Sequence, residues 1–404
     1  MRPLCLNDRL IQQKKSECTG CHACFNACPV HAISMKRDME GFLYPSVDEN
    51  ICIHCGRCVQ VCQIFQKQKD PEQIPSRAFA CMNTCMDERL SSSSGGIFIL
   101  LARYVIERNG YVFGAAFDEH MHLSHTYAST LEGCRAFMGS KYLQSRIGTS
   151  FSDAKRFLNQ GKWVLFTGTP CQIHGLKLFL GREYEKLIAV DLACHGVPSP
   201  AVFERYIDDL GKKYGSQVVG FSFRSKKTGW KSFSSQVEFE DKQSNCTEHD
   251  QCPYMKAFLS NLDLRPYCYR CNNKEGNHFS DLTMGDFWGA KAKEADMDDD
   301  KGTSVLLTNT AKGGQILQGI TQSLFIRQTD LKHVLEHNGA MVRAVSMNPY
   351  REKFFYDFNH KDAPLEELIL PYLPKRSVKE KIKAMVPAPI KEALKKALKP
   401  WMGG

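Results

Sequence analysis

Residues 18–29 read CTGCHACFNACP, and residues 52–63 read CIHCGRCVQVCQ. In both stretches three cysteines recur at every third position, and a fourth cysteine follows after three further residues. Three thiolates on one tight loop can hold three corners of a cubane iron–sulfur cluster, and the fourth cysteine begins the helix that follows. The two stretches therefore predict two 4Fe-4S clusters that lie close together.

The spacing is that of bacterial-type ferredoxins, in which the fourth cysteine of each run binds the cluster of the other run. Carried over from them, this crossed assignment gives one cluster the ligands Cys18, Cys21, Cys24 and Cys62, and the other the ligands Cys52, Cys55, Cys58 and Cys28. Residues 32–35 and 41–45 predict a hairpin that completes a small α+β, ferredoxin-like domain over residues 1–70. Gln63 stands where a proline is expected after Cys62. Zinc knuckles are the alternative, but they give the third cysteine of each run no role.

The chain has 404 residues, 18 cysteines and a net charge of +9. Its length indicates two or three domains. No run reaches the roughly 18–20 apolar residues of a membrane span, and the N-terminal residues lack the apolar segment of a signal peptide. We therefore expect a cytoplasmic protein, in which so many cysteines indicate metal ligation or redox work and not disulfides.

Most of the basic excess lies in residues 370–404, and the rest of the chain is close to neutral. A surface for nucleic acid is therefore not indicated. Residues 331–404 are expected to form a helical tail whose end is basic and amphipathic, since apolar residues recur there at helical spacing: Ile390, Ala393, Leu394, Ala397, Leu398 and Trp401. Such a helix could make a peripheral contact with the inner membrane surface or dock on the rest of the protein.

Strands and helices alternate in the body of the chain. The sequence predicts strands at residues 78–83, 111–117, 163–167, 187–192 and 218–223, and helices at residues 97–108, 172–180 and 201–210. This alternation is typical of an α/β body with a mainly parallel sheet. We expect the body to have two parts, residues 76–150 and residues 151–330.

Two polar motifs in the body are compatible with phosphate binding. Residues 91–96, SSSSGG, precede the helix predicted at residues 97–108, and residues 139–145, GSKYLQS, add further donors. Backbone N–H groups at a helix N-terminus favour a phosphate, but an ordinary helix cap and flexible turn explain the first motif equally well.

Four cysteines of the body form a second candidate metal site. Cys171 and Cys194 each follow a predicted strand, where ligands gather in α/β folds, and Cys268 and Cys271 form a CxxC motif. A zinc site made of Cys246, Cys252, Cys268 and Cys271 fits the spacing equally well. His174 and His195 lie next to these cysteines and could move protons, although a structural role beside the ligands is favoured.

At these motifs the chain resembles the family of coenzyme F420 hydrogenase/dehydrogenase beta subunits. The resemblance covers about residues 16–320 and is carried by residues 169–172, TPCQ, residues 194–199, CHGVPS, residues 265–271, RPYCYRC, and residues 280–289, SDLTMGDFWG. It implies FAD beside a 4Fe-4S cluster, with electrons passing to a second redox partner. Many bacterial relatives carry the same N-terminal two-cluster domain and come from organisms that are not expected to make the deazaflavin coenzyme.

Position by position, the resemblance implies that Cys171, Cys194, Cys268 and Cys271 bind a third cluster. It also implies that FAD contacts Ser94, Gly95, Gly96, Lys141, Gln144 and Ser145. Tyr267 stands where relatives often have a serine, and Asp286, Phe287 and Trp288 could border the flavin. No catalytic residue is indicated.

The sequence thus predicts an iron–sulfur flavoprotein oxidoreductase. It would move electrons between a one-electron carrier, the 4Fe-4S clusters, FAD and an organic or deazaflavin-type substrate, because a flavin exchanges one-electron and two-electron steps. Its expected partners are a carrier such as ferredoxin or a deazaflavin, and a partner enzyme. The alternatives are an electron-transfer subunit of a larger complex without its own substrate, and a cysteine-rich metal-binding scaffold without redox turnover.

Overall fold

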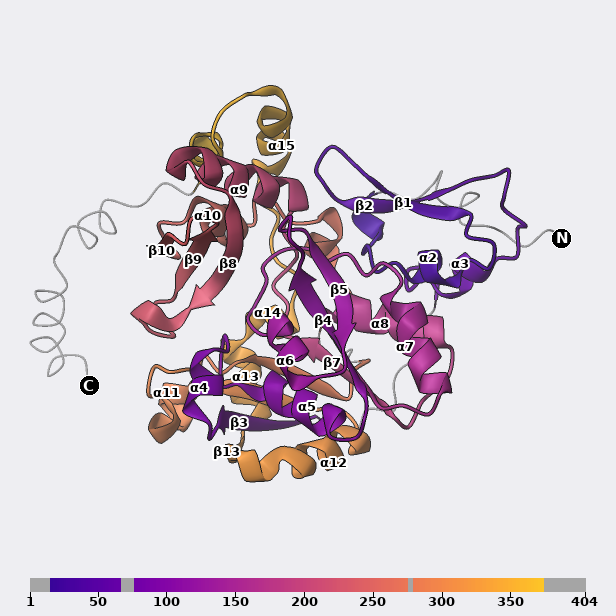
Figure 1. The fold of residues 1–404 in the computed structure, drawn as a ribbon, viewed down its shortest axis with the longest axis vertical. Coiled ribbons are helices and arrows are strands. Elements are labelled where there is room, and N and C mark those ends of the chain that lie inside the picture. Colours follow the sequence, from indigo (N-terminus) through magenta and orange to yellow (C-terminus); the bar gives the residue numbers. More distant parts are fainter. Residues whose placement is uncertain (1–14, 67–75, 275–278, 374–404) are drawn as a thin grey trace, which may run out of the picture.

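The computed structural model describes residues 15–66, 76–274 and 279–373 (Figure 1). Its centre is a sheet of eight strands in the order β13-β3-β12-β11-β7-β6-β4-β5. These strands are β3 (Arg77–Asn83), β4 (Tyr111–Phe117), β5 (Leu123–Ala128), β6 (Val164–Gly168), β7 (Leu187–Leu192), β11 (Leu282–Asp286), β12 (Ser304–Thr308) and β13 (Leu324–Thr329).

The sheet is mixed. Strands β4, β6, β7 and β11 pair in parallel at its centre, whereas β5 on one flank and β12, β3 and β13 on the other pair antiparallel. The α/β prediction is confirmed, but the mainly parallel arrangement holds only for the central strands. The connections between strands explain this difference. A parallel pair needs a crossover such as β6–α8–β7, whereas a short turn joins β4 to β5 and makes them antiparallel.

Helices cover both faces of the central strands. α5 (Ile97–Ile106) and α12 (Ala311–Ile320) pack on one face with Leu165 and Ile188, and α7 (Ser150–Asn159) and α8 (Pro170–Leu180) pack on the other with Phe166. Successive side chains of a strand point to opposite faces, so strands covered on both sides read as continuous apolar runs. Both cores therefore follow from the apolar sequence of β6 and β7.

Local sequence also sets the ends of the long helices. α8 begins at a capping box formed by Thr169 and Gln172, has Pro170 in its first turn, and ends at Gly181 with a φ of 70°. α9 (Pro200–Tyr214) begins in the same way, with the Ser199 side chain accepting a hydrogen bond from the Val202 N–H. These caps satisfy N–H groups that a helix cannot bond internally, and they fix where Cys171 lies.

The strand predicted at residues 218–223 belongs to a different sheet. β8 (Val218–Ser225), β9 (Ser234–Phe239) and β10 (Ser244–Glu248) form an antiparallel sheet of three strands. This sheet shares an aromatic core with α9, α10 (Pro253–Leu259), α15 (Arg351–His360) and α16 (Leu365–Ile369). The sequence indicated the strand correctly, but its neighbours in space are set by the hairpins that follow it.

An N-terminal module lies at one side of the body, next to α7 and α8 (Figure 1). It contains η1 (Lys15–Glu17), α2 (Ala23–Ala27), α3 (Arg57–Gln60) and an antiparallel hairpin of β1 (Ile33–Arg37) and β2 (Leu43–Val47). The predicted hairpin is confirmed. The domain boundaries at residues 70, 76, 150 and 330 stay predictions.

Residues 331–373 form α13 (Leu331–His337), α14 (Gly339–Val342), α15, α16 and η7 (Leu370–Tyr372). The amphipathic segment at residues 390–401 lies outside the described residues, so its predicted membrane contact stays a prediction. Among the described helices, none is long and apolar enough to cross a membrane.

Two adjacent glycines of α12 test this packing. A Cβ atom on Gly313 would lie 2.1 Å from the carbonyl oxygen of Asp281, whereas one on Gly314 would meet open space. We expect Gly313→Ala to lower the free energy of unfolding by about 1–3 kcal/mol. Gly314→Ala, the matched control, should raise it by about 0.5–1 kcal/mol, since alanine favours a helix interior. Chemical unfolding of the two variants measures both, and equal effects would contradict the packing.

Candidate functional site

The two cysteine loops of the module have the same backbone shape. Gly20 and His22 in the first loop, and His54 and Gly56 at the equivalent positions of the second, all have positive φ angles between 52° and 73°. The left-handed conformation curls each loop tightly. The shared shape agrees with two equivalent cysteine loops, and the binding of three ligands by each loop stays a prediction.

The structure brings the thiol of Cys62 to the first loop. Burial raises the pKa of Cys24, and the neighbouring Cys21, Cys18 and Cys62 raise it further. Burial likewise raises the pKa of Cys62 to about 12, with Cys21 again a contributor. Cys18, Cys21, Cys24 and Cys62 are partly exposed and lie close together, as in the crossed arrangement carried over from ferredoxins, and Cys58 also lies near Cys24. Their ligation of a cluster stays a prediction.

The four cysteines of the body also come together. Cys171 lies in the first turn of α8 after β6, Cys194 follows β7, and Cys268 and Cys271 lie in and after η4 (Pro266–Arg270). Burial raises the pKa of Cys171, and Cys271, Cys194 and Cys268 add to the shift. The Thr169 hydroxyl lies 3.2 Å from Cys171 Sγ, and the Val197 N–H donates to Cys268 Sγ at 3.4 Å.

The alternative zinc set is not assembled. Cys246 is exposed on β10, and Cys252 is buried in the aromatic core, where its thiol lies 3.4 Å from the Tyr206 hydroxyl. Four sulfur atoms on one zinc ion lie about 3.8 Å apart, given Zn–S bonds of about 2.3 Å. Within the described ranges, no three cysteine sulfurs lie within 4.8 Å of one another. The predicted zinc set is therefore not brought together, and ligation of a cluster by Cys171, Cys194, Cys268 and Cys271 stays a prediction.

Gln63 joins the module to the body beside these thiols. Its buried amide nitrogen donates to the Thr19 hydroxyl at 3.1 Å and to the Cys171 carbonyl at 3.0 Å, and its oxygen accepts from Asn273 at 3.0 Å. Proline, the residue expected here, could make none of these bonds. The departure from the ferredoxin pattern therefore has a structural reason, because this side chain bridges both cysteine sets.

Close packing and a buried arginine complete the junction. A Cβ atom on Gly175, one turn after Cys171 in α8, would lie 2.8 Å from Cys21 Sγ, so only glycine admits this thiol. The Arg265 guanidinium is buried and donates to the Cys18 carbonyl at 2.8 Å, the Leu43 carbonyl at 3.0 Å and the Gln144 side chain at 2.8 Å. The module is thus held against the body by contacts that involve Cys18 and Cys21 of one thiol set and Cys171 of the other.

The residues of the first motif that the resemblance assigns to FAD already make hydrogen bonds and packing contacts within the chain. The Ser94 hydroxyl donates to the Thr303 carbonyl at 2.9 Å, and the Gly95 N–H donates to Ser304 at 2.8 Å. A Cβ atom on Gly95 would lie 2.3 Å from the Cys81 carbonyl oxygen, and Gly96 has a φ of 82° at the start of α5. Packing and the turn explain these glycines, which is the plain alternative the sequence left open.

In the second motif, Gln144 and Ser145 hold neighbouring segments, whereas Lys141 and Ser140 bond to nearby backbone and to the first motif. Gln144 binds Arg265 and Ser145 lies 2.9 Å from His125 Nδ1, so both hold the module and the neighbouring loops. Lys141 donates to the carbonyls of Ala136 and Met138, and burial lowers its pKa to about 7. Ser140 approaches the first motif, since its N–H donates to Ser93 at 2.5 Å.

Next to both motifs lies an aromatic and charged group that the sequence indicated only in part. Arg224 donates to Asp286 at 2.8 Å and to the Tyr142 hydroxyl at 3.1 Å, and its Nε is buried without a partner. Trp288 is 44% exposed and stacks on Trp230 with the ring centres 5.1 Å apart. This group lies beside Cys194, because the Ala193 N–H bonds to Met284 of β11 at 2.8 Å. An exposed aromatic face and an unsatisfied donor are features that fit a flavin ring.

The histidines next to the cysteines are held structurally. His174 Nδ1 lies 3.1 Å from the Asn273 side chain, and burial lowers the pKa of His174 to about 4. His195 Nε2 lies 2.6 Å from Asn261, and burial also lowers its pKa. Both positions agree with the structural role that the sequence favoured.

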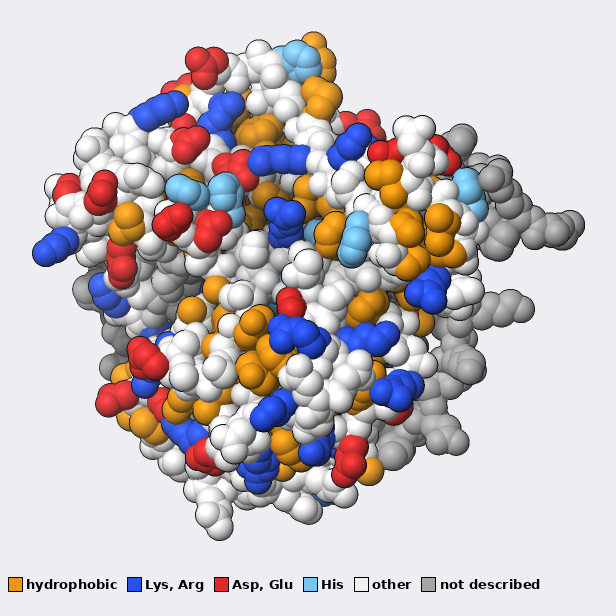
Figure 2. All heavy atoms as spheres, turned by 45° about the vertical axis from the view of Figure 1, so that its right-hand side comes forward, with side chains coloured by type: hydrophobic (Ala, Val, Ile, Leu, Met, Phe, Trp, Pro, Cys, Tyr) orange, Lys and Arg blue, Asp and Glu red, His pale blue; other side chains and the backbone are white. Residues whose placement is uncertain are grey.

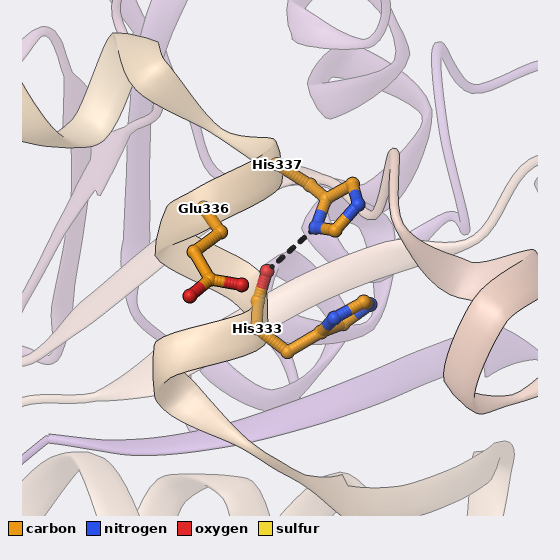
Figure 3. Close-up of side chains that lie close together, drawn as sticks. All are labelled: His333, Glu336 and His337. Atoms are coloured by element: carbon orange, nitrogen blue, oxygen red, sulfur yellow. Dashed lines mark hydrogen bonds between the residues drawn. The ribbon is translucent and has the colours of Figure 1, made fainter.

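Sequence reasoning missed Lys274, a buried cation that donates to the carbonyl oxygens of Cys194 and Ala340. It also missed a group on α13, His333, Glu336 and His337, whose ligand atoms lie within 4.8 Å of one another (Figure 3). There His333 Nε2 lies 2.9 Å from the Gly289 carbonyl oxygen and His337 Nδ1 lies 3.0 Å from that of His333, so both rings serve packing. Only the spacing of residues 333–337 on one helix could have indicated this group.

Comparison with known proteins agrees with this geometry. Residues 161–333 match the family model for the C terminus of the beta subunit of coenzyme F420 hydrogenase/dehydrogenase, and residues 17–64 match that of a 4Fe-4S dicluster domain. These matches confirm the resemblance predicted from the sequence. The chain is an iron–sulfur protein related to the beta subunits of coenzyme F420 hydrogenases and dehydrogenases.

The F subunit of the F(420)H(2) dehydrogenase of Methanosarcina mazei is 20% identical over 221 residues, which cover 52% of this chain and 62% of that relative. The chain thus spans less than two thirds of that curated relative. A chain of the F420-reducing NiFe hydrogenase complex from Methanosarcina barkeri, solved as a xenon derivative, is similar with a TM-score of 0.43 and 17% identity, over 68% of this chain and 96% of that one.

Gln63→Leu tests the junction. The substitution leaves the buried partners at Thr19, Cys171 and Asn273 without these hydrogen bonds. We therefore expect the free energy of unfolding to fall by about 1–3 kcal/mol, and the Tm to be lower under anaerobic conditions. Gln66→Leu is the matched control, because the Gln66 amide donates to the Val59 carbonyl within the module, at 3.3 Å. Differential scanning fluorimetry compares the two variants, and equal Tm values would contradict the bridging role.

Proposed function

We propose that the chain is an iron–sulfur flavoprotein oxidoreductase with three 4Fe-4S clusters and FAD. Electrons would pass between an external one-electron carrier, the two clusters of the module, the cluster of the body, the flavin and an organic or deazaflavin-type substrate. When bound, the clusters supply one-electron transfer, and the flavin supplies the exchange between one-electron and two-electron steps.

The junction between module and body carries this proposal. Cys21 of the first predicted cluster packs against Gly175 of α8, and the first turn of this helix contains Cys171 of the third. A structural metal site has no need for such contact with a second site, whereas electron transfer requires short separations. The order of the groups is then the second module cluster, the first module cluster, the body cluster and the flavin.

The chain's own residues would hold and shield these groups. Cys171, Cys194, Cys268 and Cys271 would ligate the body cluster, while Gln63, Asn273 and Arg265 fix its distance from the module. The Arg224–Asp286 pair and Trp288, beside Cys194, would border the flavin, with Ser94, Gly95, Gly96, Lys141, Gln144 and Ser145 as the residues implied by the resemblance.

A second candidate is an electron-transfer subunit without its own substrate. It is favoured by the names of the relatives, which are one subunit of a dehydrogenase and one chain of a hydrogenase complex. Co-purification of a stoichiometric partner under anaerobic conditions would favour this candidate over a self-contained enzyme.

Anaerobic purification with iron, sulfide and flavin analysis tests the proposal. We expect about twelve irons per chain, four for each of three clusters, and one FAD. Cys271→Ser should lower the iron content to about eight, whereas Cys252→Ser, at a buried cysteine outside the site, should leave it unchanged. Bound zinc without flavin would overturn the proposal.

Lys274→Met provides a separate prediction. The ammonium group lies at the Cys194 carbonyl, and a positive charge beside a cluster stabilises the reduced form. Its loss should lower the reduction potential of the body cluster, while the iron content and the potentials of the module clusters stay unchanged. An EPR-monitored redox titration measures the change, and an unaltered potential for this cluster would contradict the assignment.

A further inference from the structure

A groove of about 1080 Å³ lies between the module and the body. Asn26, Cys28 and residues of α3 line one side, and residues of α7, α8 and the loop after α8 line the other. Cys28 is a predicted ligand of the second module cluster. The groove therefore leads from the surface to the cluster that is farthest from the flavin in the proposed order.

The groove is positively charged. Arg57, Lys155, Lys177 and Arg182 line it, against a single carboxylate, Glu183, which pairs with Lys177 at 2.7 Å. For the other three cations, no carboxylate partner occurs in the part of the chain that the structure describes. They come from three separate elements, α3, α7 and the loop after α8. Figure 2, in which the right-hand side of Figure 1 comes forward, shows Lys and Arg side chains spread among apolar, polar and acidic ones.

The loop of the same cluster also exposes apolar surface. Ile51 and Ile53 flank Cys52 and are 48% and 60% exposed, and Cys55 is exposed as well. Apolar side chains near a polar, charged rim are typical of protein interfaces, and weak electron-transfer encounters are small.

We infer that this groove and the loop at residues 51–55 form a docking surface for a small acidic one-electron carrier protein. The inference rests on the proposed function and adds to it the place and charge of the partner. Opposite charges speed the encounter, and contact at Cys28 would bring the carrier's redox centre next to the second module cluster. The step is the transfer of one electron, which oxidises the carrier and reduces the chain, with no bond made or broken.

A charge-reversal variant of the full, cluster-loaded protein tests this inference. Arg57→Glu, Lys155→Glu and Arg182→Glu are combined, and stopped-flow absorbance follows reduction by a reduced acidic 2[4Fe-4S] ferredoxin. We expect the second-order rate constant at low salt to fall at least about tenfold and to lose its decrease with rising ionic strength. The matched control combines Lys242→Glu, Lys291→Glu and Lys293→Glu, which are exposed outside the groove, and should react like the wild type.

Reduction by dithionite separates the two possible failures. If dithionite reduces the clusters of both variants and the wild type alike, but the ferredoxin rates are also alike, the docking surface is wrong while the proposed function stands. If dithionite finds no reducible cluster in the wild type, the proposed function itself fails. A groove variant that reacts more slowly only with the small anion anthraquinone disulfonate would show a small-molecule site and overturn protein docking.

Discussion

The arrangement of the site depends on one buried junction, where the first turns of α8 meet the cysteine loop of the module. Gly175 leaves room for the Cys21 thiol, and Gln63 and Arg265 satisfy backbone groups on both sides. Buried polar groups are costly unless they are paired, so this network is stable only in one relative position of the two parts. That position sets the distance between the two thiol sets, and hence the rate at which an electron could cross.

The central sheet determines where the other residues of the site lie. The parallel strands β6, β7 and β11 end at one edge of the sheet, and their carboxyl ends deliver Cys171, Cys194 and Asp286 side by side. Cofactors gather at such edges because the loops there can vary without disturbing the sheet. The module contacts α8, the helix that contains Cys171, and Asp286 of the Arg224–Trp288 group ends β11.

Many residues in the motifs assigned to FAD pack against or hydrogen-bond to other parts of the chain. Gly95 packs against β3 and β12, and Gln144 anchors Arg265, so a sequence motif here reports on the fold as much as on a ligand. The features most open to a ligand, Trp288 and the unpaired Nε of Arg224, come from segments more than 60 residues apart. A pattern search along the chain does not join them.

The sequence by itself determined what depends on neighbouring residues: the spacing of the two cysteine loops, the β1–β2 hairpin, and in the body the five strands and three helices that it predicted. Local spacing fixes these features because turns, helices and cluster loops form within a few residues. Only the tertiary structure decided that Cys171, Cys194, Cys268 and Cys271 meet while Cys246 and Cys252 do not, that β8 leaves the central sheet, and that Gln63 replaces proline in order to bridge two parts. These outcomes depend on contacts between distant segments, whose partners are chosen by packing and by the pairing of buried polar groups.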